Sequence, residues 1–379
     1  MNNKADVTIS NRYKTRNSSL EFLRIISMVM IVFYHYACHG GFEWGTNELN
    51  IPHFWYNFIS MGGKVGVDIF VLISGYFLID SSVTTFNFKK VIKLWGEIFF
   101  YAISILILGG IFGKCDLSIK SIIIACFPIT FRTWWFASTY IVLYILHPFL
   151  NKFLNSIDKR TYQNFVIIAF LMWSVIPTFT TREFEGNNLI WFIVLYSIAG
   201  YIRKYGLNIK LSKSRYLTLF FVFYLITYFS SIILIIMGSK WNTFNNYSTY
   251  FFGYEKISIL FISISLFMFF ASVNVRNNRV INIIASATFG VYLISDNYVI
   301  QKFLWIDLFK NYQFQHSEAI IIHSIVAVAL VYIICTIIDL ARQITFEKQF
   351  MSIANKYGDI LLRPVKRIIN ICKKLFFGV

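Results

Sequence analysis

Residues 217–238 read LTLFFVFYLITYFSSIILIIMG, a run without one charged side chain. A helix needs about 20 consecutive apolar residues to cross the hydrocarbon of a bilayer, and this run is long enough. Further apolar segments of this kind follow one another along the chain, so the sequence predicts an all-α, polytopic membrane bundle of about ten transmembrane helices. The expected spans lie near residues 20–39, 60–80, 93–113, 134–151, 164–181, 189–203, 217–238, 251–272, 286–304 and 318–340.

The composition of the 379 residues agrees with a membrane protein, because 57% are hydrophobic, 19% aromatic and only 14% charged. An ordinary soluble domain carries roughly 25% charged residues. These figures exclude a soluble enzyme, a disordered chain and a disulfide-rich secreted module. The five cysteines are scattered without C-x-x-C spacing, so we expect neither a disulfide framework nor a zinc site.

The net charge of +17 comes from 35 basic and 18 acidic residues. In a soluble chain this excess would suggest nucleic acid, but the basic residues here form no extended patch. If the N-terminus is cytoplasmic, most of them fall in the inside loops, as the positive-inside rule requires. The sequence therefore predicts an even number of spans, both termini in the cytoplasm and no nucleic-acid partner.

The expected organisation has three parts. Residues 1–19 form a basic cytoplasmic tail, residues 20–340 the membrane domain, and residues 341–379 a basic amphipathic cytoplasmic tail suited to an interfacial helix. The segment 118–131 contains Pro128 and is too short to cross, so it is either re-entrant or interfacial. We interpret the first span as a signal anchor rather than a cleaved signal peptide.

The first span carries ionisable residues, which are costly in a bilayer and point to function. Arg24 and His35 are eleven residues apart, which on a helix leaves them about 20° from eclipsed and roughly 16 Å apart along the axis. Glu21 is placed to pair with Arg24 at i,i+3, and His39 shares the face of His35. This face suits a long substrate with an anionic head.

Two interpretations of these residues stay open. Arg24 either holds a phosphate or snorkels to the inner interface. His35 either transfers a proton near neutral pH or forms a structural hydrogen bond within the bundle. His35 and His39 at i,i+4 lack the H-E-x-x-H pattern of a metal site, so we expect no metal.

Polar residues in other spans are candidate partners of His35. Lys64 and Asp68 at i,i+4 either form a structural ion pair or leave Asp68 to orient the imidazole of His35. In the ninth span, Asp296 and Asn297 lie side by side at bilayer depth and need partners from other helices.

The third span opens with Lys90 and Lys93, one turn apart on one face. They serve either as positive-inside anchors or as phosphate ligands. Glu97 follows one turn deeper than Lys93, and we expect the two to pair.

Several of these stretches together resemble the acyltransferase-3 family of bacterial multi-spanning membrane O-acyltransferases. They are Arg24 and His35 at their spacing, the segment VDIFVLISGYFL at 67–78, Trp135-Phe136 followed by Tyr140, Tyr144 and Pro148, and FGVYLI at 289–294. The resemblance runs from about residue 18 to 340. It departs from the family at Lys90-x-x-Lys93, where relatives usually have two arginines, and at Ser295, where they often have histidine.

The resemblance implies an O-acyltransferase of the bacterial cytoplasmic membrane, which moves an acyl group, usually acetyl, from a cytoplasmic thioester to an extracytoplasmic hydroxyl. Acceptors in the family are saccharides of the capsule or cell envelope and some small molecules. It further implies that His35 is essential and that Arg24 serves the donor.

Combining residues and resemblance, we expect acetyl-CoA or another acyl-CoA as donor, with phosphates at Arg24, Lys90 and Lys93. His35 acts as general base, oriented by Asp68 or Asp296, and both direct transfer and an acyl-His35 intermediate are compatible with the sequence. The acceptor is a saccharide or lipid-linked saccharide, and a homo-oligomer is compatible with the chain.

Two other classes remain as alternatives. Intramembrane charge and the short 118–131 segment also suit a transporter or flippase of an anionic or sugar substrate, although we find no internal repeat of the kind such proteins often show. The departures from the family pattern leave room for a non-catalytic subunit of an envelope-polymer complex.

Overall fold

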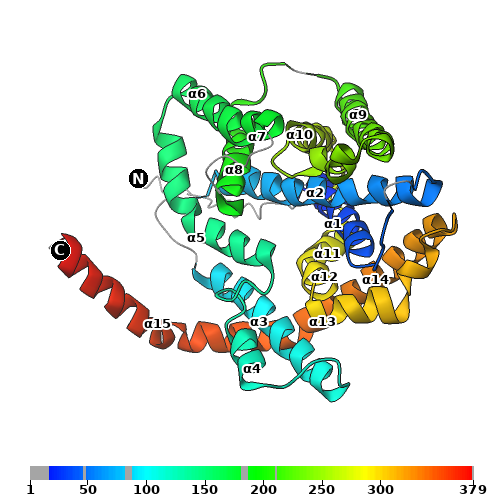
Figure 1. The fold of residues 1–379 in the computed structure, drawn as a ribbon. Helices are drawn as coiled ribbons and strands as arrows, with labels where there is room; N and C mark the ends of the chain where they lie inside the picture. Colours follow the sequence, from blue (N-terminus) through cyan, green and yellow to red (C-terminus); the bar gives the residue numbers. More distant parts are fainter. Residues whose placement is uncertain (1–16, 46–47, 82–87, 181–186, 210, 378–379) are drawn as a thin grey trace.

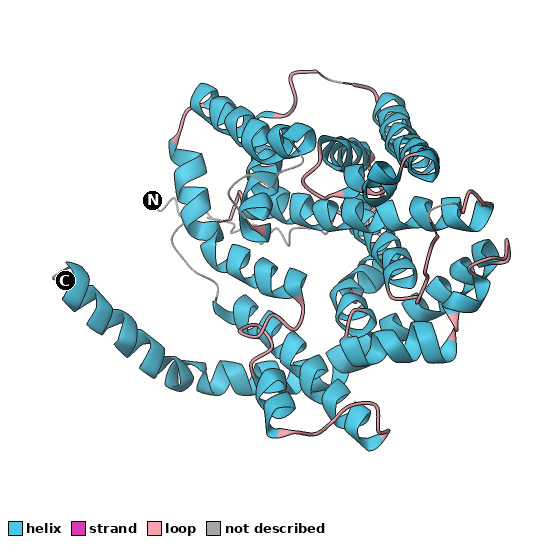
Figure 2. Cartoon of the chain, in the orientation of Figure 1, coloured by secondary structure: helices cyan, strands magenta, loops and turns pink. Residues whose placement is uncertain are grey.

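The computed structural model describes residues 17–45, 48–81, 88–180, 187–209 and 211–377, and the regular elements within these ranges are all helices (Figure 1, Figure 2). The all-α prediction is therefore confirmed for this part of the chain, while the N-terminal tail up to residue 16 lies outside it. The α-helices are α1 Ser18–Cys38, α2 Ile51–Leu78, α3 Phe88–Ile111, α4 Ile119–Cys126, α5 Trp135–Ser156, α6 Lys159–Phe170, α7 Ile176–Thr180, α8 Asn188–Tyr205, α9 Lys213–Lys240, α10 Ile257–Ser272, α11 Arg279–Ser286, α12 Thr288–Ser295, α13 Tyr298–Gln301, α14 Ile320–Arg342 and α15 Lys348–Phe377.

Helices occupy all ten predicted ranges, but the number of crossings is not confirmed as ten. By length and composition, six helices of the described chain can cross a membrane, or seven if one bent pair counts as a single span. The six are Ser18–Cys38, Ile51–Leu78, Phe88–Ile111, Lys159–Thr180, Lys213–Lys240 and Ile320–Tyr357. The cytoplasmic position of both termini stays a prediction.

Several helices begin at polar residues whose side chains satisfy first-turn amides. Asn17 accepts hydrogen bonds from two backbone N–H groups of α1, and Asn187 does the same for α8. Asn50 caps α2, where Pro52 occupies the first turn. Such caps replace hydrogen bonds that the helix start cannot make internally. At the other end of α8, Gly206 has φ +69°, a conformation that favours glycine as a helix stop.

The predicted ninth span, 286–304, is wrong as a continuous helix. The helical segments Arg279–Ser295 and Tyr298–Leu308 are bent by 76° relative to each other. Asp296 and Asn297 occupy the break, and the Asn297 side chain caps the second segment. Irregular backbone at bilayer depth is tolerated where it is buried in protein or lines a cavity. The polar pair therefore interrupts the span instead of lying within it.

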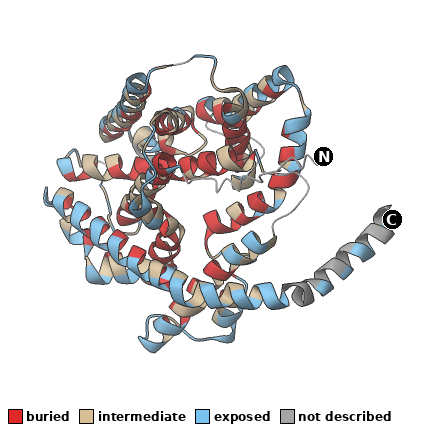
Figure 3. Ribbon diagram, turned by 180° about the vertical axis from the view of Figure 1, so that it is seen from behind, coloured by how far each residue is buried: buried red, intermediate tan, exposed pale blue. Residues whose placement is uncertain are grey.

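Helix α2 forms the centre of the bundle, and most of its length is buried (Figure 3). In the apolar 18-residue stretch of α2, 83% is buried inside the protein. The corresponding figure for α9, which lies at the periphery, is 22%. Two glycines bring α1 against it, since a Cβ at Gly66 would lie 2.6 Å from the Ser27 carbonyl oxygen and one at Gly63 would overlap Tyr34. Small residues of this kind allow close packing of membrane helices.

The short segment 118–131 contains α4, which is too short to cross, as predicted. Its apolar side chains Ile119, Ile122 and Ile123 are exposed on the surface of the bundle. Whether this segment is re-entrant or interfacial stays open.

The predicted C-terminal tail, 341–379, is helical in its described part and starts within the bundle. Helix α14 continues through a π-helical turn, Gln343–Glu347, into α15. The Phe350 ring packs over Gly96 of α3, and α15 then extends away from the other helices (Figure 1). Its location at the membrane interface stays a prediction.

We expect Gly66→Ala to destabilise the fold by about 1–3 kcal/mol, because its methyl group cannot avoid the backbone of α1. Gly62→Ala is the matched control, since the nearest atom to its added Cβ is 3.5 Å away on Met30, an ordinary contact. Thermal unfolding of both purified variants in detergent checks this difference. Equal unfolding midpoints for the two variants would show that the close approach of α1 and α2 at Gly66 does not limit stability.

Candidate active site

Two neighbouring cavities lie along the face of α1 that carries Arg24 and His35. The larger has a volume of about 680 Å³ and a lining in which basic side chains outnumber the acidic Glu97 and Glu347. The smaller, of about 160 Å³, lies beside His35 and Asp296. The basic residues of the larger cavity are Arg24, Lys93, Arg279 and Arg342. Arg24 and His35 thus face one path, as their spacing on α1 predicts.

Three phenylalanines form a wall common to both cavities: Phe70 of α2, Phe136 of α5 and Phe289 of α12. The rings of Phe70 and Phe136 meet edge to face, with centroids 6.2 Å apart. The basic cavity and the cavity of His35 therefore meet at three aromatic side chains.

His35 is 4% exposed and has a polar neighbour at each of its ring nitrogens. Its Nδ1 lies 3.1 Å from the Ser295 hydroxyl oxygen, and its Nε2 lies 3.5 Å from Oδ1 of Asp296. The same carboxylate oxygen accepts a hydrogen bond of 3.0 Å from the Gln301 amide and lies 3.6 Å from Nε2 of His39. The break in the ninth span places this carboxylate beside the imidazole, where it can stabilise a charged ring.

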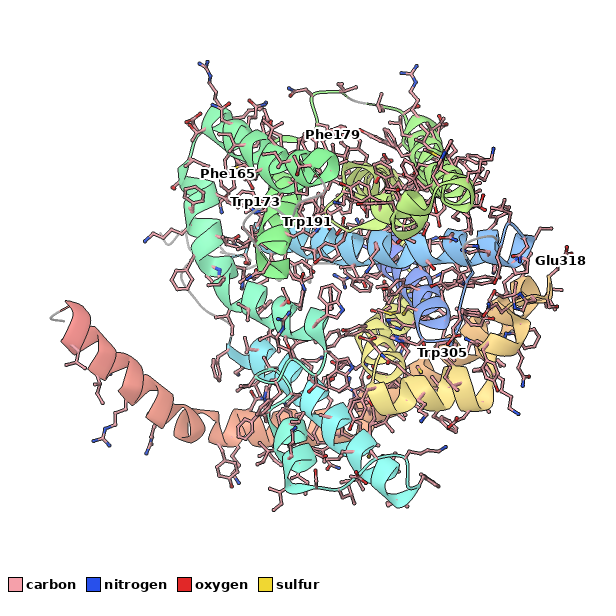
Figure 4. All side chains as sticks on the ribbon, in the orientation of Figure 1. Phe165, Trp173, Phe179, Trp191, Trp305 and Glu318 are labelled. Carbon is pink, nitrogen blue, oxygen red and sulfur yellow. The ribbon has the colours of Figure 1, made fainter. Side chains whose placement is uncertain are left out.

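Asp68, the other predicted partner of His35, lies elsewhere. Its Oδ1 accepts a hydrogen bond of 3.0 Å from the Trp191 indole, which Figure 4 shows on α8 next to α2. Within the described residues, Asp68 forms no ion pair with His35 or with Lys64. Lys64 instead donates to the Tyr34 hydroxyl at 3.3 Å. Asp68 therefore joins α2 to α8.

The predicted ion pairs of the basic cavity are partly confirmed. Arg24 lies 3.2 Å from Glu21, as expected. The expected pair of Lys93 with Glu97 is wrong, because Lys93 instead lies 2.6 Å from Glu347, beyond the end of α14. Lys90 is exposed and is not among the residues that line this cavity.

Sequence analysis missed the buried cluster around Arg342. Its guanidinium lies 3.2 Å from Glu97, 2.7 Å from Asp339 and 3.0 Å from Glu347. A Cβ at Gly290 would overlap the Asp339 carboxylate, so only glycine allows α12 to pack there. The sequence does contain an indication of this cluster, because Asp339 and Arg342 lie at i,i+3 at the end of an apolar span. The two residues fall on opposite sides of the predicted domain boundary at residue 340.

A third cavity of about 200 Å³ adjoins the His35 cavity through Asn188, which lines both. Its polar lining includes Arg132, Ser138, Thr139 and Asn187. Arg132 has φ +51°, a conformation that is uncommon for residues other than glycine. Hydroxyl, amide and guanidinium groups thus converge on one side of the His35 cavity.

The helical bundle therefore brings a buried histidine–carboxylate pair between a basic and a polar cavity. Residues 17–340 match a family model described as an acyltransferase domain, and the chain belongs to the acyltransferase-3 family. It is a membrane acyltransferase. No curated protein and no solved structure matches the chain. In the described part of the chain, no group of three or more His, Cys, Asp or Glu side chains could hold a metal ion.

The two carboxylates can be separated by amide substitution. We expect Asp296→Asn to lower the rate of acyl transfer at least about tenfold, because the imidazole loses its adjacent negative charge. Asp68→Asn is the control, since an amide oxygen can still accept from Trp191. Steady-state rates of both variants in nanodiscs check this, and a greater loss in Asp68→Asn would contradict the assignment.

Proposed function

We propose that the protein transfers an acyl group, most simply acetyl, from a cytoplasmic acyl-CoA to a hydroxyl of an extracytoplasmic cell-envelope saccharide. The observation that carries the proposal is the shared phenylalanine wall, which joins a basic cavity to the cavity of His35. A donor with an anionic head and a thin thioester arm fits this pair of spaces. The cytoplasmic membrane of a bacterium is the proposed location.

The phosphates of the donor would bind in the larger cavity. Arg24 offers a planar fork that matches phosphate oxygens, and Lys93 offers a point charge at the same cavity. Lys93 is better placed than Lys90, which lies outside the lining. The pantetheine arm would pass Phe70, Phe136 and Phe289, so that the thioester reaches the smaller cavity.

His35 would act as general base through Nε2, the nitrogen on the side of the cavity-lining Asp296. In this arrangement Nδ1–H donates to the Ser295 hydroxyl, which fixes the tautomer and leaves the Nε2 lone pair available. Nε2 takes the proton of the acceptor hydroxyl as its oxygen attacks the thioester carbonyl. The carbon–sulfur bond then breaks, and the proton passes from the imidazolium to the departing thiolate.

The third cavity would receive the acceptor. Its serine, threonine and asparagine side chains can pair with sugar hydroxyls, and Arg132 suits a negatively charged substituent. Because this cavity and the donor path both adjoin the His35 cavity, direct transfer needs no further movement of the acyl group. An acyl-His35 intermediate is the alternative course, and trapping of acylated protein in the absence of acceptor distinguishes it.

His35→Ala should abolish acyl transfer, with a loss of about 10²-fold or more, because it removes the imidazole that takes the proton of the acceptor hydroxyl. The measurement is thiol release from acetyl-CoA by protein in nanodiscs supplied with cell-envelope saccharides. His147→Ala is the matched control, because His147 is also 4% exposed but lies outside the three cavities. Full activity of His35→Ala would exclude the proposed base.

Phe289→Ala should raise hydrolysis of acetyl-CoA several-fold in the absence of saccharide, because the widened apolar zone admits water to the thioester. Phe165→Ala, on the separate helix α6, is the control. The rate of thiol release without saccharide, relative to wild type, reports this hydrolysis. An unchanged rate in Phe289→Ala would show that these rings do not separate the two cavities.

A further inference from the structure

Lys64 of α2 brings an ammonium group into the same 160 Å³ cavity as His35 and Asp296. Lys64 is not among the residues that line the larger cavity. A positive charge therefore lies on the thioester side of the phenylalanine wall, apart from the basic groups suited to phosphate.

Two tyrosines hold the ammonium in place. Its Nζ lies 3.3 Å from the Tyr34 hydroxyl and 4.6 Å from the centre of the Tyr34 ring, and the Tyr254 ring lies 5.9 Å away. Aromatic faces attract cations at these distances. Tyr34 reaches this position because Gly63, next to Lys64, leaves room for its side chain against α2.

The nearby carboxylates are engaged by other groups. Asp68, one turn further along α2, accepts from Trp191, while Glu255 lies 3.2 Å from Lys256 and Asp296 faces the two histidines. Within the described residues, no ion pair includes Lys64. Lys64 feels the charges of Glu255 and Asp68 without a direct ion pair to either. A cation in a largely apolar cavity with no ion-paired partner is costly, and such groups in membrane proteins generally serve function.

We propose that Lys64 is a further catalytic residue, whose ammonium binds the oxyanion that develops on the thioester carbonyl. The proposal rests on the function proposed above. When the acceptor oxygen attacks the carbonyl carbon, the carbonyl π electrons move onto its oxygen, and the ammonium donates a hydrogen bond to that oxygen. The electrons return as the carbon–sulfur bond breaks, so Lys64 gains and loses no proton. Groups preorganised in this way lower a barrier most in a dry site.

The kinetic test compares Lys64→Met with Lys64→Arg in nanodiscs. Lys64→Met should lower kcat about 10²-fold with an unchanged KM for acetyl-CoA, because the contact exists only in the transition state. Lys64→Arg keeps the charge and should recover part of the loss. Lys256→Met is the matched control, because this lysine is buried nearby but pairs with Glu255 and the Pro177 carbonyl.

An equilibrium test needs no turnover. We expect S-carboxymethyl-CoA, which carries an anion where the oxyanion forms, to bind the wild type about tenfold more tightly than neutral S-ethyl-CoA. Lys64→Met should lose this preference, while Lys256→Met keeps it. Titration calorimetry with these two thioethers measures it, and an equal preference in wild type and Lys64→Met would overturn the proposal.

The outcomes separate the two proposals. If His35→Ala is inactive while Lys64→Met turns over within twofold of wild type, the acyltransferase site stands and the role of Lys64 is wrong. A rise in the KM for the saccharide at unchanged kcat would likewise overturn it, because Lys64 would then bind the acceptor. If neither thioether binds the wild type, the proposed donor fails, and the role of Lys64 fails with it.

Discussion

A charge inside a bilayer is costly, and two buried charge contacts of this bundle join helices far apart in the chain. Asp296, at the break of the ninth span, lies beside His35 of the first helix. Arg342, after the last predicted span, lies beside Glu97 of the third. Each contact thus lowers the cost of a buried charge and at the same time joins distant stretches of the sequence at the edge of a cavity.

The predictable part of the molecule follows from local rules. Twenty-residue apolar runs placed helices in the right ranges, and the helical period placed Arg24 and His35 on one face, because both depend only on neighbouring residues. The Arg24–Glu21 contact at i,i+3 was accessible for the same reason. The family resemblance, carried by short stretches along the first 340 residues, agrees with the match over residues 17–340.

What the sequence concealed depends on contacts between helices. The helical period of α2 indicates that Asp68 faces another helix. Which residue it meets follows only from the packing of α8, where the Trp191 indole donates a hydrogen bond to Asp68. Lys93 and Glu97 lie one turn apart on α3, but they do not pair with each other. Lys93 pairs with Glu347 and Glu97 with Arg342, and both partners come from the far end of the chain. Two adjacent polar residues, Asp296 and Asn297, mark the position of the bend in the sequence. That Asn297 caps a new helix there is visible only in the structure, where α12 and α13 run in different directions.

The phenylalanine wall has a consequence for the energy balance of the cell. An enzyme that works from both faces of an energised membrane risks becoming a leak for ions and protons. Apolar side chains between two cavities oppose a continuous file of water, as hydrophobic gates in channels do. Phe70, Phe136 and Phe289 stand between the basic cavity and the cavity of His35. In the transfer proposed above, an acyl group would therefore change sides while the electrical insulation of the membrane is preserved.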